Sequence, residues 1–274
     1  RQAPQRAQRI DMRALLRVRG VGPEADERGA DVVAGLHRSS RIAAVEAEHV
    51  APVLDAAAPH LPDDCPVWVL PPQVVGLSPE HQRFPGTLTL GLDTLVHLWC
   101  DLGASVARAG VRKLLLFNSH GGQVSVLDLV ARDLRARLDM LVYTSSWFNL
   151  PLLDAAGQDV MARFPAHEHR FGIHAGEIET ALMLALHPER VRMDRAENFR
   201  SSSEQRARDF ELLGNGRSAK LAWQTQDLNP SGAVGNAAAA TAANGQAVLD
   251  AAGRALARLL TEIDRLPPDT LRRR

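Results

Sequence analysis

Three short segments of this 274-residue chain combine histidine or carboxylate side chains with glycine. Neutral imidazole and carboxylate groups are ligands for zinc, manganese or iron, and both also transfer protons near neutral pH. The segments therefore favour a site for metal-assisted or acid–base chemistry. They read Gly-Leu-Ser-Pro-Glu-His-Gln-Arg-Phe-Pro-Gly-Thr over residues 76–87, Asn-Ser-His-Gly-Gly-Gln over 118–123 and His-Ala-Gly-Glu-Ile-Glu-Thr over 174–180.

The segment at residues 118–123 follows an apolar run and is rich in glycine. Two glycines after His120 leave its ring open to a cleft, because glycine allows close approach and unusual dihedral angles. His120 is therefore a candidate metal ligand. The alternative is a tight turn that carries an ordinary surface histidine.

The segment at residues 174–180 begins a predicted helix, where the helix dipole already favours carboxylates without any catalytic role. The functional interpretation is a metal-binding carboxylate, Glu177, beside a general acid or base, His174. Glu177 and Glu179 are two positions apart and cannot face the same way on a helix. At most one of them would touch a metal, and the other would orient a neighbour or contact the backbone.

The segment at residues 76–87 places Ser78, Glu80 and His81 next to a Phe-Pro-Gly-Thr turn. It is either an ordinary loop or a substrate-binding loop. In the second case the backbone N–H groups of Gly86 and Thr87 would face the substrate.

Strands and helices are expected to alternate through short turns. This pattern predicts a parallel sheet covered on both faces, with the site at the carboxyl ends of the strands. Residues 188–236 are expected to be irregular. The expected strands are 66–70, 111–117 and 140–144, and the expected helices are 92–109, 124–138, 177–186 and 237–266.

Together the segments resemble the creatininase (creatinine amidohydrolase) family. The resemblance covers about residues 42–266. It is carried by Glu80–Thr87 (family pattern E-H-x-x-F-P-G-T), Asn118–Gln123 (N-G-H-G-G-N-like), His174–Thr180 (H-A-G-E-x-E-T) and Ser231–Gly245 (S-G-x-x-G-x-x-x-x-A-T-x-x-x-G).

The resemblance implies a three-layer α/β/α sandwich with a mainly parallel sheet, assembled as a homohexamer. It implies two divalent metals (Zn, Mn or Fe) and hydrolysis of a C–N bond in a cyclic amide, a formamide-type small molecule or a peptide terminus. If the residue roles of the family apply to the matching positions of this chain, His120 and Glu177 would be metal ligands and His174 would protonate the leaving nitrogen. Trp147 would either wall the substrate pocket or belong to the core.

One family segment, resembling E-Q-H-G-x-H-L-P-x-x-T-D, is not found in residues 1–41, so metal occupancy is expected to be weak. One hypothesis is a reading-frame error. If residues 34–39 are back-translated into GC-rich codons and the reading frame is shifted by one base, the product is Pro-Ala-Ser-Thr-Asp. This product resembles the L-P-x-x-T-D ending of the missing family segment. The alternative is a divergent, catalytically impaired chain that acts as a binding or scaffold protein.

The composition bounds the remaining possibilities. Lys and Arg total 32 and Asp and Glu total 32, so the net charge of zero argues against nucleic-acid binding through bulk charge. No run of 18 apolar residues predicts a membrane span, and no signal peptide is recognised. Two cysteines make no disulfide framework, so the expected location is cytoplasmic. The expected organisation is an atypical segment 1–41, a domain 42–266 and a tail 267–274.

Overall fold

The computed structural model describes residues 51–272, so the predictions about the segment 1–41 lie outside the described residues. A helical segment at residues 51–57 comes first. It is followed by α4 (Leu92–Arg108), β1 (Lys113–Asn118), α5 (Val124–Leu138), β2 (Leu141–Ser146), α6 (Ala166–Phe171), α7 (Glu177–Leu186), β3 (Asn198–Phe199), α8 (Ser202–Asp209), α9 (Thr225–Leu228), β4 (Gly235–Asn236) and α10 (Ala242–Arg265).

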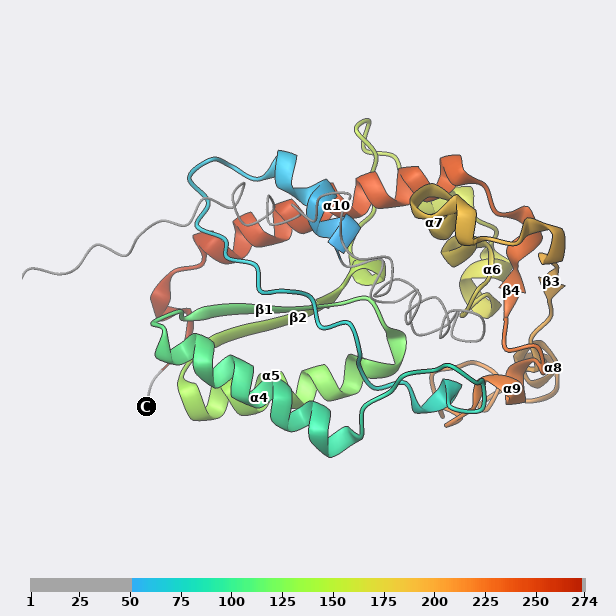
Figure 1. Ribbon diagram of the computed structural model, residues 1–274, viewed down its shortest axis with the longest axis horizontal. Coiled ribbons are helices and arrows are strands. Elements are labelled where there is room, and N and C mark those ends of the chain that lie inside the picture. The colour runs from blue at the N-terminus through green and yellow to red at the C-terminus, as the bar shows by residue number, and fades with distance from the viewer. Residues whose placement is uncertain (1–50, 273–274) are drawn as a thin grey trace, which may run out of the picture.

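The parallel pair β1 and β2 forms the centre of the molecule, in register from Lys113 opposite Leu141 to Asn118 opposite Ser146. Helix α5 makes the crossover between the two strands, as a parallel pair requires. Helices α4 and α5 cover one face and α10 lies over the other (Figure 1). These layers confirm the predicted α/β fold with helices on both faces of a parallel sheet.

The alternation of side chains along β1 supplies both layers of the core, because successive residues of a strand point to opposite faces. Leu114 and Leu116 pack with the cluster around Val130 and Leu134 of α5. Leu115 and Phe117 instead pack with the larger cluster that includes Leu256 of α10. Helices therefore pack against both faces of β1, which explains the unbroken apolar run in its sequence, although the residues before Asn118 are only partly buried.

Helix α10 packs closely on α7. A Cβ atom at Gly245 would lie 1.9 Å from the carbonyl oxygen of Ala181, so this contact requires a glycine. The prediction that the helix begins at residue 237 was wrong. It begins at Ala242, because the Thr241 side chain accepts a hydrogen bond from the N–H of Asn244 and caps the helix there.

The predicted strand at residues 66–70 was also wrong. The segment forms no strand, and Trp68 is 59% exposed. A cavity of about 910 Å³ is lined on one side by residues 66–74 and on the other by the length of β1, so the two cannot pair. Apolar character alone did not reveal that this segment has no neighbouring strand at hydrogen-bonding distance.

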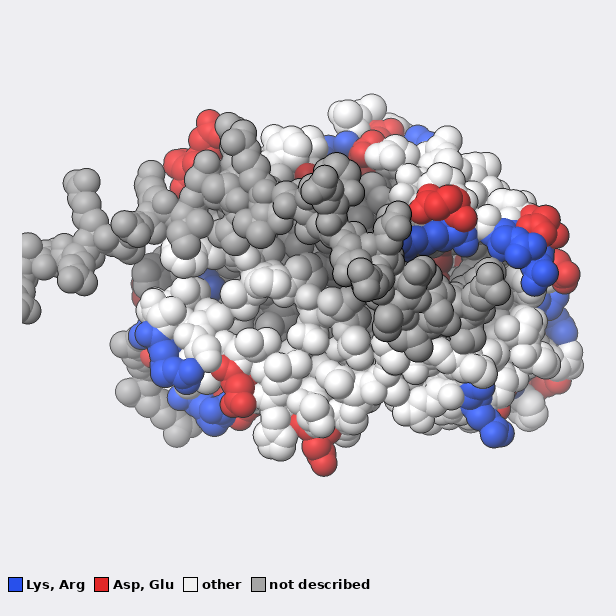
Figure 2. Space-filling view, in the orientation of Figure 1, with Lys and Arg blue, Asp and Glu red and all other residues white. Residues whose placement is uncertain are grey.

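The expectation of irregular structure over residues 188–236 is confirmed in part. Within it lie the short helices α8 and α9 and the two-residue strands β3 and β4, which pair antiparallel. On the face shown in Figure 2, acidic and basic side chains of the described residues lie side by side in small groups. No helix within residues 51–272 is both long and apolar enough to cross a membrane.

Candidate active site

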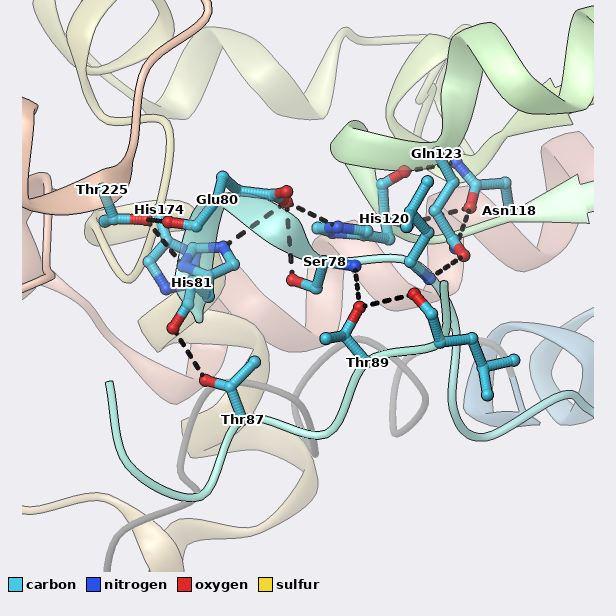
Figure 3. A network of polar contacts seen from close by, with 12 residues as sticks. Ser78, Glu80, His81, Thr87, Thr89, Asn118, His120, Gln123, His174 and Thr225 are labelled. Carbon is cyan, nitrogen blue, oxygen red and sulfur yellow. Dashed lines mark hydrogen bonds and ion pairs between the residues drawn. The ribbon is translucent and has the colours of Figure 1, made fainter. Parts of the chain in front are cut away.

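An ion pair between Glu80 and His120 joins two of the three segments. Glu80 lies in a short turn at Pro79–His81, and His120 follows the carboxyl end of β1. The Oε1 atom of Glu80 lies 2.7 Å from Nε2 of His120 (Figure 3). Their side chains are 11% and 7% exposed, so the pair is shielded from water, which strengthens its electrostatic attraction.

Asn118, the last residue of β1, holds the turn that presents His120. Its amide nitrogen donates to the carbonyl oxygen of His120 (2.7 Å) and to the hydroxyl of Ser146 (3.0 Å). Its Oδ1 atom accepts from the N–H of His120 (3.1 Å) and from the side chain of Gln123 (3.2 Å). One buried amide thus fixes the turn and ties it to the end of β2.

Gln123 connects this turn to the loop that carries Glu80. Its Oε1 atom accepts a hydrogen bond of 3.0 Å from the N–H of Leu77. The same side chain fills the space beside Gly76, where a Cβ atom would lie 2.1 Å from Oε1. The loop and the turn are therefore held at a fixed separation.

The two glycines after His120 have different roles. A Cβ atom at Gly122 would lie 2.4 Å from Oε1 of Glu80 and 2.6 Å from Nε2 of His120. At Gly121 nothing lies within 4 Å of such an atom. Gly122 is therefore required by the ion pair, whereas Gly121 is not required by packing.

His81 is held by a residue from a distant part of the chain. The Oγ1 atom of Thr225, in α9, lies 2.7 Å from Nδ1 of His81 and donates to the carbonyl oxygen of Glu80 at 2.9 Å. Both side chains are fully buried. Thr225 was missed from the sequence, because a threonine at the start of a short helix carries no local pattern that indicates such a contact.

The backbone around His174 is held in an unusual conformation. His174 forms an isolated bridge with Val234, and its carbonyl oxygen accepts from the N–H of Val234 at 2.6 Å. The next residue, Ala175, has φ of 51°, in the left-handed region that residues with a Cβ seldom adopt. Glu179 stabilises this loop by accepting from the N–H of Ala175 at 2.6 Å, and Thr180 donates to the Ala175 carbonyl at 3.3 Å.

The ring of His174 faces the other two histidines of the cluster. Its centroid lies 4.3 Å from that of His81, which in turn lies 6.2 Å from that of His120. Its Nδ1 atom is 3.5 Å from Oε2 of Glu179. Its Nε2 atom is buried and makes no hydrogen bond within residues 51–272.

Glu177 begins α7 and is buried at 5% exposure. Its N–H donates to Oε1 of Glu168 at 2.6 Å. Glu179, two residues on, faces the backbone of Ala175, as expected for the second carboxylate of the segment. Glu168 itself was missed, because it lies outside the three segments and its role depends on tertiary contacts.

Burial dominates the protonation of this cluster. Burial, together with the charge of His174, lowers the pKa of His81 to about 4. It likewise lowers the pKa of His174 to about 4. Burial raises the pKa of Glu177, and the nearby charge of Glu168 raises it further. Burial by itself would also raise the pKa of Glu80. The hydrogen bond from His120 and other favourable contacts nevertheless hold this pKa below its usual value. Both histidines are therefore neutral at pH 7, and Glu80 is ionised.

The candidate metal ligands do not form a complete site. Within residues 51–272, no group of three or more His, Cys, Asp or Glu side chains is arranged to hold a metal ion. A protein metal site needs a minimum number of ligands at the correct distances. The part of the chain that the structure describes therefore does not by itself fit a metal centre.

The other expected site residues divide into two groups. Ser78 lies at the site, with its Oγ atom 3.5 Å from Oε1 of Glu80. The N–H of Thr87, which was expected to face a substrate, donates to the carbonyl of Phe84 at 3.2 Å. Gly86 adopts φ of 94°, which serves the turn. Trp147 is 5% exposed within the core cluster, so it is a core residue and not a pocket wall.

The sequence model of creatininase, described as creatinine amidohydrolase, matches residues 42–260. The chain belongs to the creatininase family. The match includes all three segments from which the site is built. The chain is thus a hydrolase of this family, as the resemblance predicted.

Named relatives of this creatininase-family chain fall into two groups. A mycofactocin precursor peptide peptidase from Mycobacterium tuberculosis is 30% identical over 238 residues, which cover 84% of this chain and 80% of that protein. The peptidase of the same name from Mycobacterium ulcerans is 32% identical over 67% of this chain and 62% of its own length. A creatinine amidohydrolase from Pseudomonas putida is 35% identical over 120 residues, 41% of this chain and 45% of that protein.

The solved structures agree on the fold. A Bacteroides fragilis protein assigned to the creatinine amidohydrolases superposes with a TM-score of 0.63 at 26% identity, covering 79% of this chain and 80% of that one. A crystallised creatininase superposes with a TM-score of 0.61 at 23% identity, covering 82% and 84%. Each likeness extends over most of both chains.

Proposed function

We propose that this chain hydrolyses the C–N bond of an amide at the cluster of Glu80, His81, His120 and His174. The observation that carries the proposal is His174, whose buried Nε2 atom has no hydrogen-bond partner among the described residues. Its Nδ1 atom faces Glu179 at 3.5 Å. A neutral ring that keeps its proton on Nδ1 has a lone pair on Nε2, where it can accept a proton from water and return it to the leaving nitrogen.

The ion pair of Glu80 and His120 supports this proposal by placing charge next to the proton-transferring ring. Glu80 Oε1 is also 3.8 Å from Nε2 of His81. A carboxylate in a shielded site stabilises positive charge that develops on nearby imidazole rings during proton transfer. Ser78 and His81 would contact the substrate, since both lie on the same loop as Glu80.

A divalent metal is part of the proposal, with His120 and Glu177 as its ligands. Solved creatininases include a form described as Zn-Zn and another as Mn. A bound metal of this kind supplies Lewis-acid polarisation and a more acidic water. Because residues 51–272 contain no complete ligand group, tight metal binding would require further ligands from outside these residues.

The proposed substrate is a cyclic amide or a formamide-type small molecule. A peptide is the second candidate, and a specific observation favours it. The 910 Å³ cavity runs along β1 from Arg112 to His120 and is lined mainly by apolar side chains. A six-residue strand spans about 20 Å, so this cavity matches an extended segment better than a single small ring. The mycobacterial relatives are named as peptidases of a precursor peptide.

The test is a panel of creatinine, aryl formamides and apolar peptides of six to ten residues, assayed with Zn²⁺ and with Mn²⁺. Cleavage that is lost in His174→Gln supports the proposal. A folded protein that cleaves none of these compounds supports the scaffold alternative instead. We also propose that the chain assembles as a homo-oligomer, which the family resemblance implies to be a hexamer. Analytical ultracentrifugation of the same sample would test this assembly.

A further inference from the structure

Glu168 is a buried carboxylate outside the three segments. It lies on α6 and is 2% exposed. Its Oε1 atom accepts from the N–H of Glu177 at 2.6 Å, and its Oε2 atom accepts from the N–H of Asn236 at 3.0 Å. Both donors are backbone groups, so the two oxygens of one side chain join the start of α7 to strand β4.

These two hydrogen bonds enclose the bridge that holds His174. His174 pairs with Val234, while Glu177 and Asn236 lie three and two residues further along their respective segments. The bridge is antiparallel, so the chain runs from His174 to Glu177 and from Val234 to Asn236 in opposite directions, and the one carboxylate accepts from the N–H groups of both. Hydrogen bonds to a charged acceptor are about twice as strong as neutral ones, so this contact is well suited to hold the loop.

Three glycines surround the carboxylate closely. A Cβ atom at Gly172 would lie 2.1 Å from Oε1 of Glu168, one at Gly176 would lie 2.2 Å away, and one at Gly235 would lie 2.8 Å away. At Gly172 the three atoms nearest to such a Cβ all belong to Glu168. The absence of a side chain at these three glycines, which lie in separate segments, therefore leaves the space that the Glu168 carboxylate occupies.

From this geometry we propose that Glu168 is a positioning residue for the active site, and this rests on the proposed function of His174. Its carboxylate fixes the N–H of Glu177 and so holds the backbone between the two proposed functional side chains, His174 and Glu177. That backbone includes the left-handed Ala175, which is an unfavourable conformation without restraint. Releasing Glu168 would let Ala175 relax and turn both side chains away from the cluster.

The test compares Glu168→Gln with Glu204→Gln in the full chain. Glu204 is a matched control, because it is also a buried carboxylate (6% exposed) that accepts a backbone N–H, but it lies in the cap of α8. In Glu168→Gln the side-chain NH₂ group would face one of the two backbone N–H donors. Amide hydrogen exchange over residues 174–177 and 236 is expected to accelerate about tenfold or more, and to stay unchanged there in Glu204→Gln.

Steady-state kinetics give the second measurement. In Glu168→Gln, kcat is expected to fall by about tenfold or more while KM changes less than threefold, because the substrate loop at Glu80 and His81 is untouched. Should Glu168→Gln not fold, Gly172→Ala displaces the carboxylate without removing the charge, since the three atoms nearest to its Cβ all belong to Glu168. Unchanged exchange at these amides in both variants would overturn the proposal. If exchange accelerates in Glu168→Gln but the wild-type chain cleaves none of the compounds, the positioning contact is established and only the proposed hydrolysis is refuted.

Discussion

The Nε2 atom of His120 lies 2.7 Å from Oε1 of Glu80, and Gly122 lies so close that a single added methyl group would enter this contact. The pair joins the turn after β1 to the loop at residues 76–87. Two segments that are remote in sequence thus meet through a histidine and a carboxylate. The turn that carries the histidine requires glycine at position 122, because a Cβ atom there would enter the contact.

The two glycines after His120 give a paired test. Gly122→Ala places its Cβ 2.4 Å from Oε1 of Glu80, so we expect the ion pair to separate and kcat/KM to fall by about tenfold or more. Gly121→Ala meets no atom within 4 Å and is expected to stay within twofold of wild type. Equal activity of the two variants would show that the ion pair is not needed. The crystal structure of Gly122→Ala would locate the displaced group.

Thr225 provides a test of the contact that fixes His81. Thr225→Val removes the hydroxyl and leaves Nδ1 of His81 buried without this partner. An unsatisfied buried polar group costs about 1–3 kcal/mol of unfolding free energy. Thr225→Ser keeps the hydroxyl and is expected to lose less than half as much. Urea denaturation monitored by circular dichroism measures both, and a larger loss in the serine variant would contradict the assigned role.

The buried histidines predict a pH dependence of stability in the metal-free protein. The folded pKa values of His81 and His174 are about 4, against an ordinary value of 6.5 for each. Between these limits the unfolded chain binds more protons, so stability present above pH 6.5 is lost as the pH falls toward 4. Each histidine contributes about 3 kcal/mol at most.

Urea denaturation at pH 7.5, 6.0 and 5.0 measures this loss. The variant His81→Gln is expected to show a shallower decline than wild type, because one of the two groups no longer titrates. A wild-type stability that stays constant over this interval would show that both rings take up protons as readily in the folded as in the unfolded chain, which contradicts the lowered pKa values.

The ligand set predicts weak metal binding. Within residues 51–272 no group of three or more His, Cys, Asp or Glu side chains is arranged to hold a metal ion, so we expect less than one Zn²⁺ or Mn²⁺ per chain after dialysis. Elemental analysis of the purified protein gives the stoichiometry. Two tightly held metals per chain would require that ligands from outside the described residues complete the site. His120→Ala is the matched variant, and it is expected to lower any residual binding.

The sequence predicted local structure well where the signal was local. The apolar stripe of Leu127, Val130 and Leu134 predicted α5 with its observed ends at Val124 and Leu138. The Gly-rich turn after β1 was predicted as the place of chemistry, because carboxyl ends of parallel strands gather functional side chains. The three segments do meet in space, in that Glu80 contacts His120 and His81 lies next to His174.

Features that depend on distant partners could not be predicted in this way. Residues 66–70 have the composition of a buried strand, yet a strand forms only where a neighbour lies at hydrogen-bonding distance. Thr225 reaches His81 across 144 residues, and Glu168 acts through backbone groups of two other segments. The sequence left open whether Trp147 lines a pocket or belongs to the core. In the structure it packs in the core cluster that includes residues of α10.

The crowding around Glu168 has a consequence for how this chain can vary. Gly172, Gly176 and Gly235 belong to different segments, yet a Cβ atom at each would lie within 2.8 Å of the same carboxylate, and at Gly235 also 2.7 Å from the Cα atom of Gly176. A mutation at one of these positions is therefore coupled to position 168 rather than to its own neighbours in sequence. A chain that acquires alanine at position 172 is expected to survive only together with a shorter side chain at 168, so these sites can change jointly but not one at a time.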